Sequence, residues 1–433
     1  MSFMQKYRTW VTEHARQVNN AQKKLLLNDI LLFVIMRELS RMNSEEKKKR
    51  SYIKKRFWAH PIFRLRNKYG FYNAICPTLS RYELEYKNYM RMSLSQFEDL
   101  LALVAPYITK RTMTRDPIPA AARLSMTLKY LAIGDSTNSM SYQYLVETTT
   151  VSNIIAETCA ALWDCLAKEV LPFPLSKEDW LSIAQNFEDR WDFNHCIGAI
   201  DGKHVAIQNH HSIVLLGICD ANYMFTFVDI GAYGRRNDGG IFRDSIVGQK
   251  FFNKEMRLPE PEKLTIDGDP MPYVLVADEA FQLSDFLLRP YPRKGGLDHE
   301  KTIYNYRLSR ARRTIDNTFG VLVSQWRILR KPIDATAKNT MQIVRAIICI
   351  HNWLRKQDLD KNEYISADMV DCDEPNGFIP GSWRKEMDSS HALTDLGNCG
   401  TNNSSRAAIN IRNEFCDYFN GEGAIPWQYF RRQ

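Results

Sequence analysis

The most informative hydrophobic pattern lies in the middle of the chain, where short apolar runs are bounded by polar residues. Residues 196–200 form such a run, which leads into Asp201, and alternation then resumes with Val205. Residues 273–277 form a second run, which leads into Asp278. Short runs of this kind are typical of buried strands. The pattern therefore predicts two buried strands that each end in an aspartate.

Between these runs, the pattern predicts a hairpin, a helix and a loop. Residues 212–219 and 223–230 are apolar stretches joined by Asp220-Ala-Asn222, which predicts two paired strands. Residues 242–252 then predict a helix, and the Pro-rich residues 254–272 a surface loop. The core therefore has three strands, a helix and a fourth strand, in that order.

The region upstream of this core has a helical pattern. Residues 93–104, 121–133, 141–146 and 150–166 predict helices. A short helix, a turn and a longer helix fit a helix-turn-helix. Its recognition helix would begin with Thr149, Thr150, Ser152 and Asn153, which can hydrogen-bond phosphates or base edges. The absence of Lys and Arg from this start favours a plain helical subdomain instead.

Downstream of the core, two helices, a linker and a terminal helix are expected. Residues 307–320 carry Asp316 in a helical pattern, and residues 340–356 predict a strongly apolar helix. Residues 360–406 are acidic at first and then rich in Ser, Asn and Gly, which predicts flexibility. The expected parts are a helical and basic N-terminal region (1–92), a helical subdomain (93–190), an α/β core (191–356), a flexible linker (357–406) and a C-terminal helix and tail (407–433).

Composition narrows the class of protein. The chain has 44% hydrophobic and 25% charged residues, as expected of a globular protein, and its net charge of +8 suits a polyanionic partner. Its nine cysteines include no Cys-x-x-Cys pair, which favours a reducing compartment and no structural zinc. The apolar stretch 25–36 is interrupted by Asn28 and Asp29 and is too short to span a bilayer, so no membrane partner is expected.

The three aspartates are the candidate site. A carboxylate on a buried strand needs a compensating partner, and a divalent metal is the commonest one that also does chemistry. Two strand-end acids, Asp201 and Asp278, and one helical acid, Asp316, can converge on one or two Mg²⁺ ions, which prefer oxygen ligands. Two such ions clamp the attacking and leaving oxygens of a phosphoryl displacement.

A long ordered series of motifs covers roughly residues 55–355. The motifs are Tyr89-Met-Arg-Met-Ser93, Gly198-Ala-Ile-Asp-Gly-Lys-His-Val205, Val276-Ala-Asp-Glu-Ala-Phe281, Tyr304-Asn-Tyr-Arg-Leu-Ser-Arg-Ala-Arg-Arg313 with Asn317-Thr-Phe-Gly320, Trp326-Arg-Ile-Leu329 and His351-Asn-Trp-Leu354. With these motifs the chain resembles the PIF/Harbinger transposases and the nucleases derived from them. The resemblance implies a ribonuclease-H-like mixed sheet flanked by helices and a metal-dependent DNA endonuclease of the DDE superfamily. Asp201, Asp278 and Asp316 would then be its catalytic and metal-binding residues, holding Mg²⁺ or Mn²⁺.

The chain departs from this family in two places. The family's usual third acid is Glu, and here Asp316 is one CH₂ shorter, so a direct ligand needs a closer helix or a bridging water. Only Gln208-Asn-His-His211 separates the first two strands, where the family carries a longer segment. The fold tolerates both changes, but each weakens the expectation of cleavage.

Basic residues beside the acids predict contacts with DNA. Arg307, Arg310, Arg312 and Arg313 share the helix of Asp316, and arginine favours bidentate phosphate contacts. Lys203 and His204 follow Asp201 directly. The alternative is a solvated face with local ion pairs for the arginines, and a structural partner of a carboxylate for His204. The basic residues 47–67 predict a nuclear import signal or a phosphate-binding strip, and the alternative is a solvated helix face.

Three functions compete at this point. The first is the Harbinger-type endonuclease, located in the nucleus alone or in both nucleus and cytoplasm. The second is a domesticated, catalytically impaired protein that binds DNA or chromatin and keeps the fold. The third, a metal-dependent phosphoesterase acting on small molecules, fits the basic helix and loops less well. The resemblance also implies a Myb/SANT-like accessory protein as a partner, and an oligomer is compatible with the sequence.

Overall fold

The computed structural model describes residues 3–14, 31–32, 36, 60–111, 116–208, 211–233, 238–293, 295–359, 361, 363–374, 377–388, 393–395 and 404–429. The chain divides into two compact units, Met1–Pro61 and Ile62–Gln433. The first unit contains α1 (Phe3–His14). Most of the expected N-terminal helical residues 1–45, and residues 47–59 of the basic strip, lie outside the described residues.

A helical part precedes the sheet, as the sequence predicts. Its elements are α3 (Pro61–Arg64), α4 (Arg66–Tyr69), α5 (Phe71–Ala74), α6 (Cys76–Leu79), α7 (Glu83–Met90), α8 (Leu94–Ile108), α9 (Ala120–Ile133), α10 (Thr137–Tyr144), α11 (Thr148–Val170) and α12 (Lys177–Trp191). The Ser93 hydroxyl accepts a hydrogen bond from the Gln96 amide at 3.2 Å, and the Gln96 side chain accepts one from the Ser93 amide, so a capping box starts α8. Gly134, at φ 71°, ends α9 in the left-handed conformation that glycine adopts without strain.

The predicted short helix, turn and longer helix are present as α10 and α11. Leu145 takes a left-handed conformation, at φ 51°, and turns the chain between them. Val151, Ile154 and Leu162 are buried along α11, which packs against α8, α9 and α16. Thr149 and Asn153 are exposed near the start of α11. The pair therefore has the element order of a helix-turn-helix, and the DNA-reading role of α11 stays a prediction.

One mixed sheet forms the core of the α/β part. Its strands are β1 (Cys196–Ile207), β2 (His211–Cys219), β3 (Phe225–Tyr233), β6 (Val274–Val276) and β7 (Leu287–Leu288), in the order β3-β2-β1-β6-β7. The first three strands are antiparallel, and β6 runs parallel to both β1 and β7. The predicted hairpin is confirmed: the Asp220 carboxylate accepts hydrogen bonds from the amides of Asn222 and Met224, which shapes its turn.

The structure differs from the prediction at several points of this sheet. β1 continues through Asp201 to Ile207, because alternating burial resumes beyond the aspartate, so Asp201 lies within the strand and not at its end. The predicted helix 242–252 is two helices, α13 (Asp238–Asp244) and α14 (Ile246–Phe252), because the Ser245 hydroxyl caps a new helix by accepting from the Gly248 amide. The predicted loop 254–272 contains a small hairpin, β4 (Glu262–Lys263) and β5 (Pro270–Met271).

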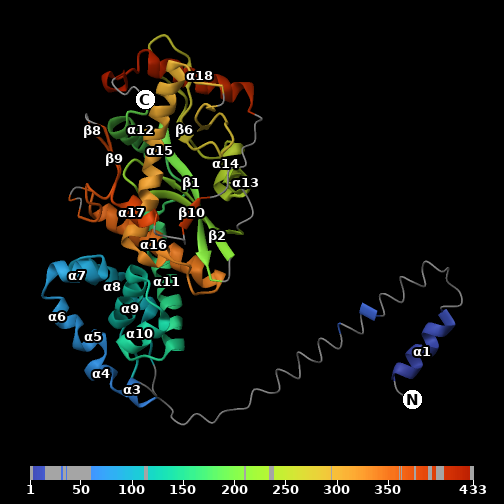
Figure 1. Ribbon diagram of the computed structural model, residues 1–433, viewed down its shortest axis with the longest axis vertical. Helices are drawn as coiled ribbons and strands as arrows, with labels where there is room; N and C mark the ends of the chain where they lie inside the picture. The colour runs from blue at the N-terminus through green and yellow to red at the C-terminus, as the bar shows by residue number, and fades with distance from the viewer. Residues whose placement is uncertain are drawn as a thin grey trace. The chain divides into compact units, whose positions relative to one another are not determined.

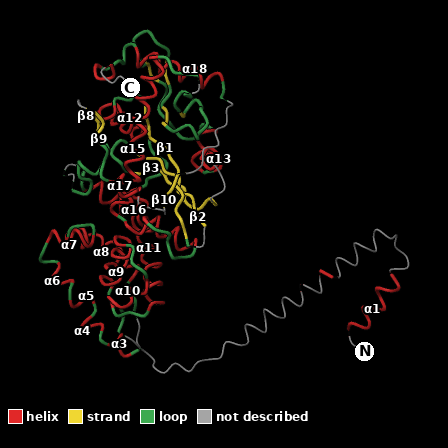
Figure 2. Tube along the Cα trace, in the orientation of Figure 1, coloured by secondary structure: helices red, strands yellow, loops and turns green. Residues whose placement is uncertain are grey.

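Two long helices cover the sheet and join it to the helical part. They are α15 (His299–Gln325), which contacts β1, β2 and β6, and α16 (Ala337–Gln357), which contacts β3 and α11. A 3₁₀ helix, η1 (Arg327–Arg330), follows α15. Figure 1 shows α15 running along the sheet, and Figure 2 shows the strands gathered apart from helices α8 to α11. The motif at residues 351–354 makes this junction, since Asn352 donates to the carbonyls of Val170 and Phe225.

The described part of the expected flexible linker 357–406 has fixed partners instead. It contains β8 (Cys372–Glu374), β9 (Gly377–Ile379), α17 (Trp383–Asp388) and β10 (Leu393–Asp395). α17 packs on α15, where the Trp383 ring lies against Gly320 and the Trp383 indole donates to the Asn317 side chain at 2.9 Å. β10 pairs with β1. These contacts could not be predicted from the polar composition of the segment, because they depend on a few buried apolar residues such as Trp383 and Leu393.

The C-terminal helix is confirmed as α18 (Arg406–Asn420), and a 3₁₀ helix, η2 (Pro426–Tyr429), follows it. Phe415 and Phe419 are buried against Phe193, at the entrance to β1. In the described part of the chain, no helix is both long and apolar enough to cross a bilayer. The cysteines described there are free thiols.

Candidate active site

Asp201 and Asp278 lie side by side because their strands are adjacent and parallel. In the register of β1 and β6, Ala199 is opposite Val276, and each aspartate follows two residues later along its own chain segment. Asp201 is buried, with 4% of its surface exposed, whereas Asp278 is half-buried beyond the end of β6. One Asp278 oxygen accepts a hydrogen bond from the Ala280 amide at 2.9 Å. The sheet thus places two carboxylates at equivalent positions.

Helix α15 contributes the third acid together with a guanidinium. Arg312 and Asp316 are one helical turn apart, and Arg312 Nη1 lies 3.1 Å from Asp316 Oδ2. The same guanidinium reaches the sheet, where Arg312 Nη2 lies 3.8 Å from Asp201 Oδ2. The three predicted acids are therefore brought to one region, and Arg312 joins two of them.

Lys203 and Asp395 complete this group of charges. Lys203 is two residues after Asp201, on the same face of β1, and its Nζ lies 2.9 Å from Asp201 Oδ2. It also forms a shorter ion pair with Asp395, which the register of β10 places opposite Lys203. We call Asp201, Asp278, Asp316 and Asp395, with Lys203 and Arg312, the acid cluster.

Burial and mutual charge shift the proton equilibria of the acid cluster. Burial raises the pKa of Asp278 and of Asp316 above the ordinary value, the charge of Asp201 adds to both rises, and Arg312 opposes them. For Lys203 and Arg312, burial alone would lower the pKa, but the surrounding carboxylates outweigh it and raise both values. Both cations are therefore firmly charged, and the acids repel one another.

The donor chemistry of the acid cluster suits a divalent cation. Its four carboxylates and two basic groups leave a formal excess of negative charge, and Mg²⁺ takes oxygen ligands. Asp201 Oδ2 is buried and has no hydrogen bond; Lys203 Nζ is close to it in distance but does not meet hydrogen-bond geometry. In the described residues, no three Asp, Glu, His or Cys side chains are arranged as ready metal ligands. Lys203 and Arg312 supply the present charge balance.

His204 does not join the acid cluster. Side chains alternate along a strand, so His204 faces away from Asp201 and Lys203. Its Nδ1 lies 3.1 Å from the Ser212 hydroxyl of β2. The predicted contact of His204 with a phosphate at the acids is therefore not supported by its position.

Three of the four arginines predicted to bind DNA are tied to the protein itself. Arg307 is 1% exposed, donates to the Gln428 side chain and the Gly423 carbonyl, and lies 4.3 Å from the Phe419 ring. Arg310 pairs with Asp192 and Asp373.

Arg313 pairs with Asp373 at 2.8 Å and lies over the Phe378 ring. The helical pattern predicted a basic face on α15, but the flanking and C-terminal segments cover three of its arginines. Only Arg312 points to the acids.

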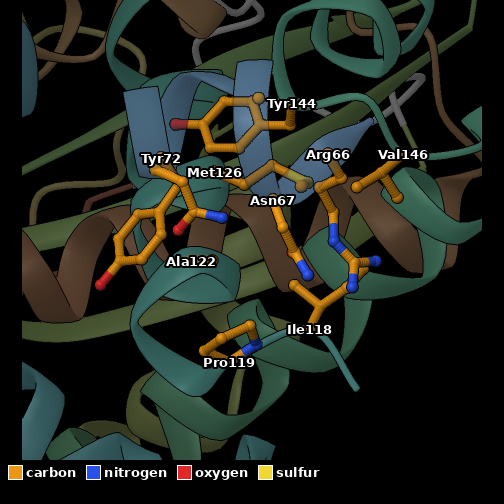
Figure 3. Close-up of a pocket in the computed structure, with 11 residues that line it drawn as sticks. Arg66, Asn67, Tyr72, Ile118, Pro119, Ala122, Met126, Tyr144 and Val146 are labelled. Carbon is orange, nitrogen blue, oxygen red and sulfur yellow. The ribbon is translucent and has the colours of Figure 1, made fainter. Parts of the chain in front are cut away.

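Asp395 is a member of the acid cluster that the sequence did not predict. It lies in the segment predicted as a linker, and a three-residue strand carries too little periodicity to be recognised. Cavities in the described part of the chain lie elsewhere, and two of them are well defined. A small one of about 20 Å³ lies in the helical part beside Asn67, Met126 and Tyr144 (Figure 3). A larger one of about 780 Å³ lies beside Phe252 and Phe286. Neither is lined by the acid cluster.

Comparisons with known proteins bear on the superfamily of the chain. Residues 202–352 match the family model described as DDE superfamily endonuclease, which confirms the resemblance to that superfamily. The chain is also similar to the protein named antagonist of Like Heterochromatin Protein 1 from Arabidopsis thaliana, at 22% identity over 305 residues, which cover 66% of this chain and 75% of that protein. No solved structure matches the chain.

Proposed function

We propose, from the match of residues 202–352 to the DDE superfamily endonucleases, that this chain is a transposase-derived DNA endonuclease of the Harbinger type. Its site would be a D-D-D variant made of Asp201, Asp278 and Asp316. The observation that carries the proposal is the parallel register of β1 and β6, which sets two acids side by side, with Arg312 of α15 linking Asp316 to Asp201. The strand order β3-β2-β1-β6-β7 supports a ribonuclease-H-like sheet.

Each charged group has a part in this proposal. Asp201, Asp278 and Asp316 would hold Mg²⁺ or Mn²⁺, with Asp201 Oδ2, which accepts no hydrogen bond, as one of the ligand oxygens. When bound, such ions activate water and stabilise the charge that develops on a phosphate during cleavage. Lys203 and Arg312 remain beside the acids and would donate hydrogen bonds to the phosphate oxygens of DNA. The pair would therefore orient the scissile phosphate.

A second function is favoured by the same two cations. Lys203 and Arg312 already neutralise part of the acid cluster, and Arg312 holds the short Asp316 side chain within its own helix. The curated relative is named as an antagonist of a heterochromatin protein. By analogy, this chain would be a domesticated, catalytically impaired protein that binds DNA or chromatin.

The remaining features of the proposal concern partners and location. DNA is the proposed partner, together with a Myb/SANT-like accessory protein, and the nucleus is the proposed location. The net charge of +8 and the basic residues 47–67 support a polyanionic partner. These features rest on the resemblance and the sequence.

A plasmid-nicking assay separates the two functions. Supercoiled plasmid is incubated with the full chain and Mg²⁺ or Mn²⁺, beside Asp201→Ala and Asp316→Glu. The endonuclease predicts metal-dependent nicking that Asp201→Ala abolishes and Asp316→Glu preserves or raises, because Glu restores the usual reach. DNA binding without nicking in the wild type and in Asp316→Glu would favour the impaired protein. Nicking that survives Asp201→Ala would refute the assigned site.

A further inference from the structure

The edge of β1 that faces β6 has three successive neighbours. β6 pairs with the start of β1, up to Ala199, and β10 pairs with residues 203–205. Ile333 forms a parallel bridge to Ile207 at the end of the strand. Asp201 lies in the interval between β6 and β10. A carboxylate on β10 therefore lies along the same edge of β1 as the acids on β1 and β6.

Lys203 is shared between Asp201 and Asp395. Its side chain is 7% exposed, so it is confined between its neighbours. The ion pair with Asp395 is shorter than the 2.9 Å separation from Asp201. Asp395 itself is 82% exposed and open to solvent. The ammonium is therefore shared between Asp201 and a carboxylate at the rim of the acid cluster.

The strand that carries Asp395 is anchored by other residues. Leu393 is 2% exposed and lies opposite the fully buried Val205. This apolar pair stabilises β10 on β1 without the carboxylate. Replacing Asp395 should therefore change the charge beside Lys203 and leave the strand in place.

We infer that Asp395 is a positioning residue of the acid cluster, which shares the Lys203 ammonium with Asp201 and so weakens its hold on the Asp201 oxygen that a divalent cation would take. The inference rests on the proposed metal-dependent function and adds a fourth acid to it. Without Asp395, the ammonium has only Asp201 as its close partner in the described part of the chain, and it competes there with an incoming cation. The segment around β10 then belongs to the site.

The experiment measures Mn²⁺ binding to the full chain by isothermal titration calorimetry, with no DNA present. Asp395→Asn should weaken Mn²⁺ affinity by about 10- to 100-fold, the range found for residues that support a metal site from outside its ligands. Asp395→Glu should restore most of that affinity. Lys203→Met should bind Mn²⁺ more tightly than the wild type. In the Lys203→Met background, Asp395→Asn should have only a small effect, because the lysine it positions is gone.

Asp373→Asn is the matched control. Asp373 lies in the same segment, residues 357–406, and pairs with Arg310 and Arg313 outside the acid cluster. Its loss should therefore leave Mn²⁺ affinity unchanged. Wild-type affinity in Asp395→Asn would overturn this inference alone. A full loss in the Lys203→Met background would also overturn it and make Asp395 a direct ligand. No Mn²⁺ binding by the wild type would overturn the proposed endonuclease and this inference together.

Discussion

At the scale of single residues, the acid cluster combines repulsion with internal counterions. Burial and the charge of Asp201 raise the pKa of Asp278 and Asp316, so their ionised forms are less favourable in the folded chain than in the unfolded chain. Lys203 and Arg312 offset only part of this cost. The repulsion among these carboxylates lowers the stability of the metal-free protein, and a bound divalent cation would offset that repulsion.

Asp278→Asn should therefore stabilise the metal-free protein at neutral pH. A carboxyl whose pKa is raised on folding opposes stability above its ordinary pKa, and the amide removes that charge. We expect a gain of about 1 kcal/mol, the scale of a typical substitution, which shrinks as the pH falls toward about 4. Thermal unfolding in EDTA at two pH values measures it.

Asp285→Asn, at an exposed position outside the acid cluster, is the matched control and should change little. Added Mn²⁺ should stabilise the wild type and not Asp278→Asn. A metal-free Asp278→Asn variant less stable than the wild type would contradict the repulsion described above.

His351 shows a pH effect of the opposite sign. It is buried between the Tyr223 carbonyl, 2.8 Å from Nε2, and the Tyr364 hydroxyl, 3.0 Å from Nδ1, and burial lowers its pKa to about 4. The unfolded chain takes up this proton near pH 6.5, before the folded chain does. His351 therefore lowers the free energy of unfolding as the pH falls from about 6.5 to about 4, on the order of 3 kcal/mol in total.

His351→Gln should flatten the pH dependence of stability in that window. Its amide can still donate to the Tyr223 carbonyl, and glutamine does not titrate. Urea unfolding of both proteins at pH 7, 5.5 and 4.5 gives the comparison. Parallel curves for the two proteins across these values would show that His351 is not the group responsible.

At the scale of elements, α15 organises the second unit. One face lies on the sheet and carries Arg312 and Asp316 to the acids. Other residues of the helix contact later segments. Asn317 and Gly320 contact Trp383 of α17, and Arg307 donates a hydrogen bond to Gln428 in the C-terminal turn. The motifs that run through α15 therefore serve the packing of the fold as well as the candidate chemistry.

Gly320→Ala should weaken the docking of α17. A Cβ at this position would lie 2.3 Å from the Trp383 ring, which forces the two elements apart. Overpacking of this kind costs about 1–3 kcal/mol. In a Trp383→Leu background, the same change should become neutral or favourable, because alanine is the better helix former by about 1 kcal/mol. Denaturation of the four proteins gives this cycle, and an equal cost in both backgrounds would exclude the ring as the cause.

Arg307→Ala should act on stability and leave DNA affinity alone. It removes donors to the Gln428 side chain and the Gly423 carbonyl in a buried position, which costs about 1–3 kcal/mol. Arg327→Ala, at an exposed position, should cost less than about 0.5 kcal/mol. Chemical denaturation measures the costs. If Arg307→Ala lowers DNA affinity while stability is unchanged, the packing role assigned to Arg307 is wrong.

Across the chain as a whole, most of the positive charge that could contact DNA lies outside α15. Three arginines of α15 are engaged in contacts within the protein, so we expect basic residues of other segments to contribute more of the attraction that the net charge of +8 implies. The sequence identifies residues 47–67 as the densest basic stretch. Any nonspecific affinity for DNA should come mainly from contacts of such groups with phosphates.

Replacing Lys47, Lys48 and Lys49 together by Gln should reduce the salt dependence of DNA binding. Each phosphate contact contributes a slope of about 0.9 in a plot of log affinity against log salt, because a counterion is released. Fluorescence anisotropy with a duplex at several salt concentrations gives the slope. The triple replacement of Arg307, Arg310 and Arg313 should leave it unchanged. The reverse pattern would return DNA binding to α15.

The elements whose signals are local could be predicted from the amino-acid sequence. The apolar runs before Asp201 and Asp278, the hairpin at Asp220, and the helices that became α15, α16 and α18 were all predicted, because hydrophobic periodicity and turn residues act over a few positions. The ordered motifs likewise indicated the superfamily that residues 202–352 match. Adjacent parallel strands then placed the two predicted acids together.

Which charged side chains contact one another depends on the folded arrangement of the whole chain. Lys203 and Asp395 are 192 residues apart in the chain, and Arg307 and Gln428 are 121 apart, so no local pattern connects them. Polar side chains carry no periodic signal for their partners, because an ion pair depends on which surfaces the apolar residues bring into contact. For that reason the sequence predicted one basic face of four arginines. In the folded protein, three of them contact the flanking and C-terminal segments, and the fourth contacts the acids.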